Sequence, residues 1–170
     1  DLILSVSGTL SWKKLSLYFL LDTQLGGNIY NATRQLLYFN ERHADLDQAG
    51  KPDDKKKVVN YYIGGLTPGL GIGLYNNNNP TEHFVESATF LTIREINVSY
   101  TFDADILNTI GINFIRDIRL SLVGRNLLTF TGYTGYNPEV ALAGNATSFR
   151  VDQFTYPVFR TFTAALQVRF

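Results

Sequence analysis

The chain contains no cysteine and no methionine, has no net charge, and has only 5 prolines among its 170 residues. The absence of cysteine excludes a disulfide framework, a thiolate nucleophile and a cysteine-type metal site. The balanced charge gives no electrostatic reason to expect nucleic acid or an acidic partner. No apolar run is long enough for a transmembrane helix. Aromatic residues, in contrast, are abundant, with 10 tyrosines and 12 phenylalanines.

The sequence starts with Asp1, whereas a translated chain starts with methionine. We therefore expect the chain to begin after processing or partway through a longer product, and it carries no signal peptide. Both features fit an outer-membrane protein whose leader has been removed. They fit a secreted soluble β protein equally well.

The last segment, Pro157–Phe170, has apolar residues at every second position counted back from Phe170. This period of two predicts a β-strand with one apolar and one mostly polar face. A strand that ends on an aromatic residue is typical of transmembrane β-barrels, where an aromatic girdle meets the interface. The apolar residues could serve as a recognition signal for the barrel-assembly machinery, or could simply face lipid. They include Phe162, Leu166, Val168 and Phe170.

The same alternation predicts four further strands, and the first two of them form a hairpin around the Lys13-Lys14 turn. Large apolar residues on one face and small polar residues on the other suit a wall between lipid and a wet lumen. They equally suit a strand pair of a sandwich with one solvated face. The four segments are Leu2–Trp12, Leu15–Asp22, Ala88–Phe102 and Asp117–Phe130.

Two long segments, Gly26–Glu86 and Thr131–Tyr156, lack the alternation and are rich in loop-forming residues. A short helix is expected between Asn28 and Ala44. Its predicted apolar side consists of Tyr30, Leu36, Leu37 and Phe39. Such long connections are uncommon in compact soluble domains and are commonly functional.

The number of strands predicts how the chain would cross a membrane. If the C-terminus lies in the periplasm, both long segments are extracellular, whereas Lys13-Lys14 and Asp103–Arg116 are periplasmic. The second of these is expected to extend the strands beyond the membrane. A complete bacterial barrel has an even number of strands, and five strands cannot close one in lipid. We therefore expect an N-terminal part that is absent from this chain.

Four stretches of the chain resemble the C-terminal part of SusC-like TonB-dependent transporters, which are outer-membrane nutrient importers of Bacteroidetes. They are Leu25–Asn31 (LGGNIYN), Ser87–Phe102 (SATFLTIREINVSYTF), Val123–Val140 (VGRNLLTFTGYTGYNPEV) and Tyr156–Phe170 (YPVFRTFTAALQVRF). The last three are similar to the family patterns sFlRLknltLgYtf, qNLfTfTkYkGyDPEv and YPlprtftlGlnlsF. The chain departs from these patterns at Asn137, where aspartate is frequent, and at Ala164-Ala165, where a glycine is common.

The resemblance implies that the chain is all-β and supplies the last five strands of an antiparallel transmembrane barrel of about 22 strands, with long extracellular loops. It implies a plug domain and a TonB-contacting segment in the missing N-terminal part. It also implies a SusD-like surface lipoprotein as a lid, outer-membrane lipid around the barrel, and an oligosaccharide or a peptide as substrate. No cofactor is implied. The expected location is the outer membrane of a Gram-negative bacterium of the Bacteroidetes type.

Two sets of residues are candidates for function. The first lies in an outer loop and either contacts ligand or the lipoprotein, or forms a structural turn; it comprises Tyr136, Asn137, Pro138 and Glu139. The second is expected to face the lumen, where it either forms ion pairs within the wall or lines the transport path; it comprises Asp22, Glu95, Arg119 and Arg125.

Tyrosines of the first long loop could stack on sugars or pack the loop. They are Tyr30, Tyr38, Tyr61, Tyr62 and Tyr75. No motif of a nucleophilic enzyme accompanies the Ser, His and Asp residues, and His43 and His83 lack clustered ligands at metal spacing. We therefore expect a transporter segment rather than an enzyme. Two alternatives remain open, a secreted soluble β-sandwich that binds carbohydrate through loop tyrosines, and a small complete barrel.

Overall fold

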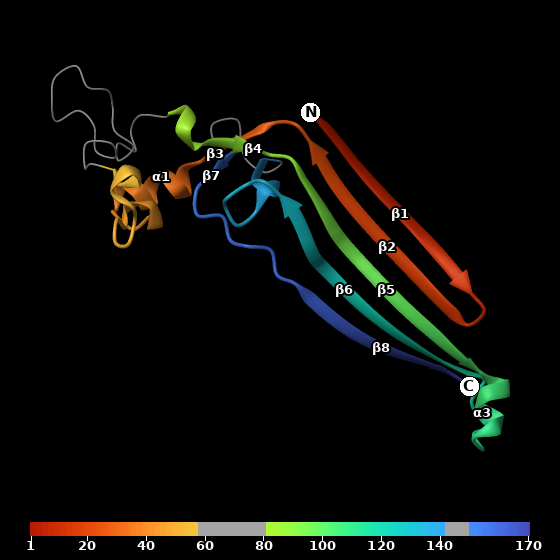
Figure 1. Cartoon of the computed structure of the whole chain (residues 1–170). Coiled ribbons are helices and arrows are strands. Elements are labelled where there is room, and N and C mark those ends of the chain that lie inside the picture. The colour runs from red at the N-terminus through yellow and green to blue at the C-terminus, as the bar shows by residue number, and fades with distance from the viewer. Residues whose placement is uncertain (58–80, 142–149) are drawn as a thin grey trace. The chain divides into compact units, whose positions relative to one another are not determined.

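The computed structural model describes residues 1–57, 81–141 and 150–170, so the predicted contacts Tyr61, Tyr62 and Tyr75 lie outside the described residues. The chain divides into two compact units (Figure 1). We call the first the sheet unit; it comprises Asp1–Leu25, Phe90–Thr131 and Val158–Phe170. We call the second the loop unit; it comprises Gly26–Thr89 and Gly132–Pro157.

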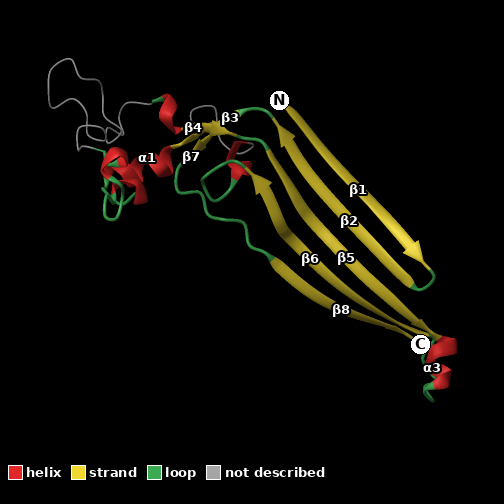
Figure 2. Ribbon diagram, viewed as in Figure 1, coloured by secondary structure: helices red, strands yellow, loops and turns green. Residues whose placement is uncertain are grey.

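The sheet unit is a single antiparallel sheet whose strands pair in chain order, β1-β2-β5-β6-β8. The long strands lie side by side in Figure 2. Their bounds are β1 (Leu2–Trp12), β2 (Leu15–Leu25), β5 (Phe90–Asp103), β6 (Asp117–Thr131) and β8 (Thr161–Arg169). A strand therefore forms at each of the five segments where the alternation of the sequence predicts one.

The register of the sheet separates apolar from polar residues across four strands, because residues opposite each other in a ladder share a face. One row of cross-strand neighbours is wholly apolar: Leu17, Val98, Leu122 and Ala164. The next row lies on the other face and consists of small residues, three of them serines: Ser16, Ser99, Ser121 and Ala165. The sheet thus has one apolar and one largely polar face.

Burial in the sheet unit is the reverse of that in a water-soluble core. On the apolar face, Leu10 is 62% exposed, Leu122 54% and Leu166 65%. Most of the buried side chains of this unit are polar, and they include Gln24, Thr92, Ser99 and Asp117. A β-sandwich would bury the apolar face of the sheet, so these exposures argue against the soluble alternative.

The Lys13-Lys14 turn, helix α3 (Ala104–Thr109) and the C-terminus lie at one end of the sheet (Figure 1). The prediction that the segment 103–116 extends the strands is wrong. Asp103 ends β5 and its carboxylate accepts a hydrogen bond from the Ile106 N–H at 3.3 Å. An aspartate in this position caps a helix, and the chain turns into α3 instead of continuing as a strand.

A bulge interrupts the alternation in the middle of the sheet, where the β2–β5 and β5–β6 registers shift between Ile93 and Glu95. Opposite the bulge, Asn126 has a φ of 52°, a left-handed conformation that asparagine tolerates better than most residues. The guanidinium of Arg94 donates to Asp22 at 2.7 Å and to the side-chain oxygen of Asn126 at 3.1 Å. The bulge therefore points an additional arginine toward two polar side chains.

The loop unit contains a small three-stranded sheet in the order β4-β3-β7, in which β3 pairs antiparallel with β4 and parallel with β7. The strands are β3 (Asn28–Asn31), β4 (Val85–Ser87) and β7 (Val151–Asp152). Four short 3-10 helices accompany them among the described residues: Ala44–Leu46, Asp53–Lys55, Glu82–Phe84 and Pro138–Ala141. The parallel pair joins positions about 120 residues apart in sequence.

Helix α1 (Ala32–Phe39) lies where the sequence predicts a helix, but its apolar side is not the predicted one. The residues it buries are Gln35 and Tyr38, whereas Phe39 is 48% exposed. Tyr38 packs with Phe84, Tyr30 and Leu46, and this cluster determines which face of the helix turns inward. Among the residues that the structure describes, no helix combines the length and the apolar character needed to cross a membrane.

Candidate functional site

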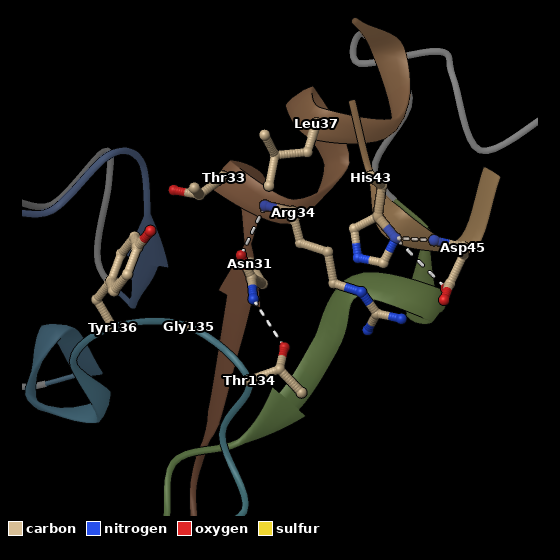
Figure 3. A pocket seen from close by; sticks show the side chains of 9 residues that line it. All are labelled: Asn31, Thr33, Arg34, Leu37, His43, Asp45, Thr134, Gly135 and Tyr136. Atoms are coloured by element: carbon tan, nitrogen blue, oxygen red, sulfur yellow. Dashed lines mark hydrogen bonds and ion pairs between the residues drawn. The ribbon is translucent and has the colours of Figure 1, made fainter. Parts of the chain in front are cut away.

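A cavity of about 350 Å³ opens in the loop unit (Figure 3). Its walls come from the end of β3, from α1 and the segment after it, and from the segment that follows β6. The lining residues are Asn31, Thr33, Arg34, Leu37, His43, Asp45, Thr134, Gly135 and Tyr136. We call this cavity the loop pocket.

Asn31 holds the three walls of the loop pocket together. Its side chain is 2% exposed, and its oxygen accepts a hydrogen bond from the Arg34 N–H at 2.8 Å, which caps α1. Its amide nitrogen donates to Glu86 at 3.0 Å and to the Thr134 hydroxyl at 3.4 Å. One buried amide thus ties the strand, the helix and the second loop to a single point.

Glu86 is the acceptor on which these segments converge. Its carboxylate accepts hydrogen bonds from the Thr134 N–H and hydroxyl at 2.8 Å, and from Arg34 at 3.2 Å. Burial raises the pKa of Glu86, but the hydrogen bonds from Thr134, Asn31 and Arg34 outweigh burial, so the pKa lies below its ordinary value. Glu86 is therefore charged at neutral pH and offsets the charge of Arg34.

The His43 ring lines the other side of the pocket and is backed by the buried Tyr38. The His43 ring stacks on Tyr38 with centroids 4.1 Å apart and an angle of 12°, and the Arg34 guanidinium lies 5.8 Å from the same ring. The Tyr38 hydroxyl donates to Asp45. Burial and this hydrogen bond raise the pKa of Tyr38 to about 12. Burial lowers the pKa of His43, so both rings are neutral at neutral pH.

The neutral state of His43 sets its hydrogen-bonding role. Its Nδ1 accepts from the Asp45 N–H at 3.2 Å, so in the neutral ring the proton resides on Nε2. The ring consequently keeps one N–H donor at the pocket.

A buried pair supports the second loop. The Tyr133 hydroxyl donates to Asp152 at 2.5 Å, and the two residues are 6% and 2% exposed. Burial and this hydrogen bond raise the pKa of Tyr133. Gly135 lies two residues after Tyr133. A Cβ atom at position 135 would lie 2.4 Å from the Tyr133 ring, so only glycine is accommodated there. Tyr136 is then 77% exposed.

Of the four predicted loop contacts, only Tyr136 lines the pocket. The side-chain oxygen of Asn137 accepts from the Glu139 N–H at 3.0 Å, and Pro138 is buried at the start of a 3-10 helix. This geometry is that of a turn started by Asn-Pro. The structure therefore shows that these residues form a turn, and their role as contacts remains a prediction.

The loop pocket offers a guanidinium, threonine hydroxyl groups, an imidazole donor and an exposed aromatic face. Such a set can bind hydroxyl or amide groups of a ligand by hydrogen bonding and stacking. In the ranges 1–57, 81–141 and 150–170, no group of three His, Cys, Asp or Glu side chains could hold a metal ion.

The four residues predicted to face the lumen share the polar face of the sheet, since the register places them in its polar rows. Arg125 and Glu95 form an ion pair at 2.8 Å, and Arg119 donates to the Ser99 hydroxyl at 2.8 Å. Asp22 pairs with Arg94 at 2.7 Å, not with a predicted residue. The polar contacts run between neighbouring strands, whereas the part of these residues in a transport path remains a prediction.

The predicted assembly-signal residues lie in or beside the last strand. Phe162, Leu166 and Val168 are on the apolar face of β8, opposite Gly124, Leu120 and Ile118 of β6. Phe170 follows the end of β8 and is 84% exposed. Their role in assembly remains a prediction.

No protein-family model matches the chain. It is 31% identical over 157 residues to TonB-dependent receptor P39 of Formosa agariphila. This alignment covers 89% of this chain and 14% of that receptor. It is 24% identical over 177 residues to TonB-dependent receptor P3 of the same organism, across 100% of this chain and 16% of that protein.

Solved structures of the RagAB peptide transporter share its fold. One, in an open-open state, has a TM-score of 0.63 at 24% identity and covers 98% of this chain and 17% of the other. A second has a TM-score of 0.63 at 26% identity and covers 93% of this chain and 16% of the other. The chain is a segment of a SusC-like TonB-dependent receptor.

As a segment of such a receptor, the chain spans 14% and 16% of the length of the two curated relatives. Both are named as receptors, in agreement with the expectation that the chain is not an enzyme.

Sequence reasoning missed Arg94 and most of the residues that build the loop pocket. Arg94 breaks the alternation of two apolar-face residues, Ile93 and Ile96, which are three positions apart instead of two. That irregular spacing is a signal for a bulge. The convergence of Asn31 and Thr134 on Glu86 has no such signal, because these residues are distant in sequence.

Proposed function

We propose that the chain is the C-terminal part of the wall of a SusC-like TonB-dependent transporter in the bacterial outer membrane. It supplies the last five strands of a closed barrel of about 22 strands. The plug domain and the earlier strands belong to the rest of the protein. The expected location is the outer membrane of a Bacteroidetes-type organism.

The observation that carries this proposal is the apolar face of the sheet. It runs across all five strands, it is exposed, and the opposite face holds serines, threonines and ion pairs. In lipid, an exposed apolar band is favourable and a polar inner face meets the wet lumen. In water, an apolar patch of this extent would be a liability.

The whole transporter imports an oligosaccharide or a peptide with energy delivered by TonB, which contacts the part of the protein that precedes this chain. A SusD-like surface lipoprotein acts as its lid. The names of the curated relatives support TonB dependence, and the RagAB structures are those of a peptide importer. The loop unit is the part of this chain that meets the substrate or the lid, with Tyr136 as the exposed contact.

Cysteine labelling of the full-length transporter in whole cells tests the orientation, and the absence of native cysteine in this stretch simplifies it. Tyr136→Cys should react with a membrane-impermeant maleimide on intact cells. Lys13→Cys, in the hairpin turn, should react only after the outer membrane is permeabilised. Labelling of Lys13→Cys on intact cells would contradict the proposed orientation.

A second experiment tests the loop contact. Tyr136→Ala in the full-length protein should reduce substrate uptake or retention of the lipoprotein during purification. Phe154→Ala serves as the matched variant, because Phe154 is another exposed aromatic residue of the loop unit, 59% exposed, and does not line the pocket. Unchanged uptake and unchanged lipoprotein retention in Tyr136→Ala would remove Tyr136 from the contact surface.

The terminal aromatic residue is proposed to act in barrel assembly together with Phe162, Leu166 and Val168. Phe170→Ala should lower the amount of assembled transporter in the outer membrane, whereas Gln167→Ala on the polar face should not. Equal assembly of the two variants would leave Phe170 as an ordinary lipid-facing residue.

A further inference from the structure

The hairpin turn of the sheet unit contains a second cavity, of about 390 Å³. Its lining residues are Trp12, Lys13, Lys14, Leu15 and Tyr100. The register places Trp12, Leu15 and Tyr100 in one cross-strand row, which lies on the apolar face of the sheet. The cavity therefore joins the end of the apolar face to two ammonium groups.

The two lysines differ in what they contact. Lys14 is fixed, because its Nζ lies 2.5 Å from the Asp103 carboxylate and its carbonyl accepts from the Thr101 N–H at 3.0 Å. Lys13 is exposed, and its Nζ lies 5.2 Å from the centroid of the Trp12 ring. Among the described residues, no carboxylate forms an ion pair with Lys13. The turn thus keeps one uncompensated positive charge, held against an aromatic face.

Lys13 also occupies a position that favours another residue type. It is the first residue of a two-residue hairpin loop and has a φ of 54°. The tight hairpin turns that suit twisted strands need positive φ at this position, where glycine is preferred. A lysine therefore carries a conformational cost in this turn that a glycine would avoid.

We propose that this cavity binds one phospholipid, with its phosphodiester at the Lys13 ammonium and an acyl chain against Trp12, Leu15 and Tyr100. The single negative charge of a phosphodiester matches the single free charge of the turn. Aromatic rings and lysines that flank an apolar band are the groups that anchor a protein at the lipid interface. The inference rests on the proposed function, since it requires the apolar face to meet lipid and the turn to lie at the periplasmic interface.

Native mass spectrometry of the full-length transporter in mild detergent tests the site with phosphatidylglycerol as the probe. Lys13→Gly removes the ammonium and relieves the backbone strain, so it should lower lipid occupancy about fivefold without lowering the melting temperature. Lys13→Arg keeps the charge and should keep the occupancy. Trp12→Ala should lower occupancy through the acyl-chain contacts.

Two outcomes would overturn the proposal. One is equal lipid occupancy of Lys13→Gly and the wild type. The other is displacement of the lipid by millimolar inorganic phosphate, which would make the cavity a phosphate site rather than a lipid site. The labelling of Lys13→Cys separates this inference from the proposed function. If Lys13→Cys is labelled only after permeabilisation and Lys13→Gly still binds lipid like the wild type, only the lipid site is contradicted. If Lys13→Cys is labelled on intact cells, the proposed orientation itself is contradicted.

Discussion

The two units of this chain bury opposite kinds of residues. The sheet unit exposes leucines and phenylalanines and buries polar side chains such as Thr92 and Ser99. The loop unit buries Ile29, Tyr38 and Phe84 and holds the carboxylate of Glu86 by several hydrogen bonds. One polypeptide thus contains two units suited to different surroundings, one to lipid and one to water.

This contrast shows which forces hold each unit. The sheet rests on long backbone ladders of 9 to 15 residues per strand, in which every interior strand is paired on both sides. The strands of the loop unit have only two to four residues, so its stability depends on side chains. Substitutions should therefore have opposite consequences in the two units, and the following predictions use that difference.

The largest effect is expected from a charge on the apolar face of the sheet. Ala164 and Ala165 are consecutive, exposed, and central in β8, but they face opposite sides. Ala164→Arg should cost about 2–4 kcal/mol of unfolding free energy because an arginine at mid-bilayer depth loses its hydration. Ala165→Arg, on the polar face, should cost far less. Denaturant titration of the full-length transporter in lipid vesicles measures both, and equal costs would contradict the assignment of the faces.

An intermediate effect is expected from a buried hydrogen bond of the loop unit. Tyr133→Phe removes the hydroxyl that donates to the buried Asp152 carboxylate, so it should destabilise this unit by about 1–3 kcal/mol. Tyr136→Phe, three residues later, changes an exposed hydroxyl and should have no measurable effect on stability. Limited proteolysis of the extracellular loops in the full-length protein reports the difference. A Tyr133→Phe variant as resistant as the wild type would show that the pair contributes nothing.

The smallest effect concerns acid. The pKa of Glu86 in the folded loop unit lies below its ordinary value of 4.5. The stabilisation from its charged form is therefore complete above about pH 4.5 and is lost as the pH falls through the lower, folded-state pKa. Hydrogen exchange of the β3 and β4 amides, corrected for the intrinsic effect of pH, should accelerate in this acid range.

Glu86→Gln provides the control for the acid effect. It should exchange faster at neutral pH, but its exchange should depend less on pH in the acid range. A wild-type loop unit whose protection is unchanged down to pH 3 would contradict the role of Glu86.

The sequence predicts the sheet well because alternation is a local property. Residues two apart share a face in any strand, so the apolar row through Leu122 and the placement of Glu95 and Arg125 on the polar face follow from the alternation. The bulge at Arg94 is the place where this logic fails. At that position the ion pair of Asp22 with Arg94 depends on the register shift between Ile93 and Glu95.

The loop unit was far less predictable. Its helix α1 is only eight residues long, so its periodicity is a weak signal. A tyrosine can be buried or exposed depending on its neighbours. For both reasons the sequence predicts the wrong buried face for α1. Tyr38 is buried because Phe84 lies against it, with ring centroids 5.8 Å apart. No local pattern connects Tyr38 with Phe84, because the two residues are 46 positions apart in the sequence. Long-range contacts of this kind determine which residues line the loop pocket, and they produce no periodic pattern in the sequence.

The pairing of β3 with β7 sets the order in which the chain can reach its final structure. Each pairing in the long sheet joins strands that are consecutive in that sheet's chain order, so these strands can associate one after another as they become available. The Tyr30–Val151 pair must instead wait until more than a hundred residues have been added and brought back, and closing so large a loop is entropically costly and slow. The loop pocket likewise joins Asn31 to Thr134, 103 positions apart, so it too is completed late.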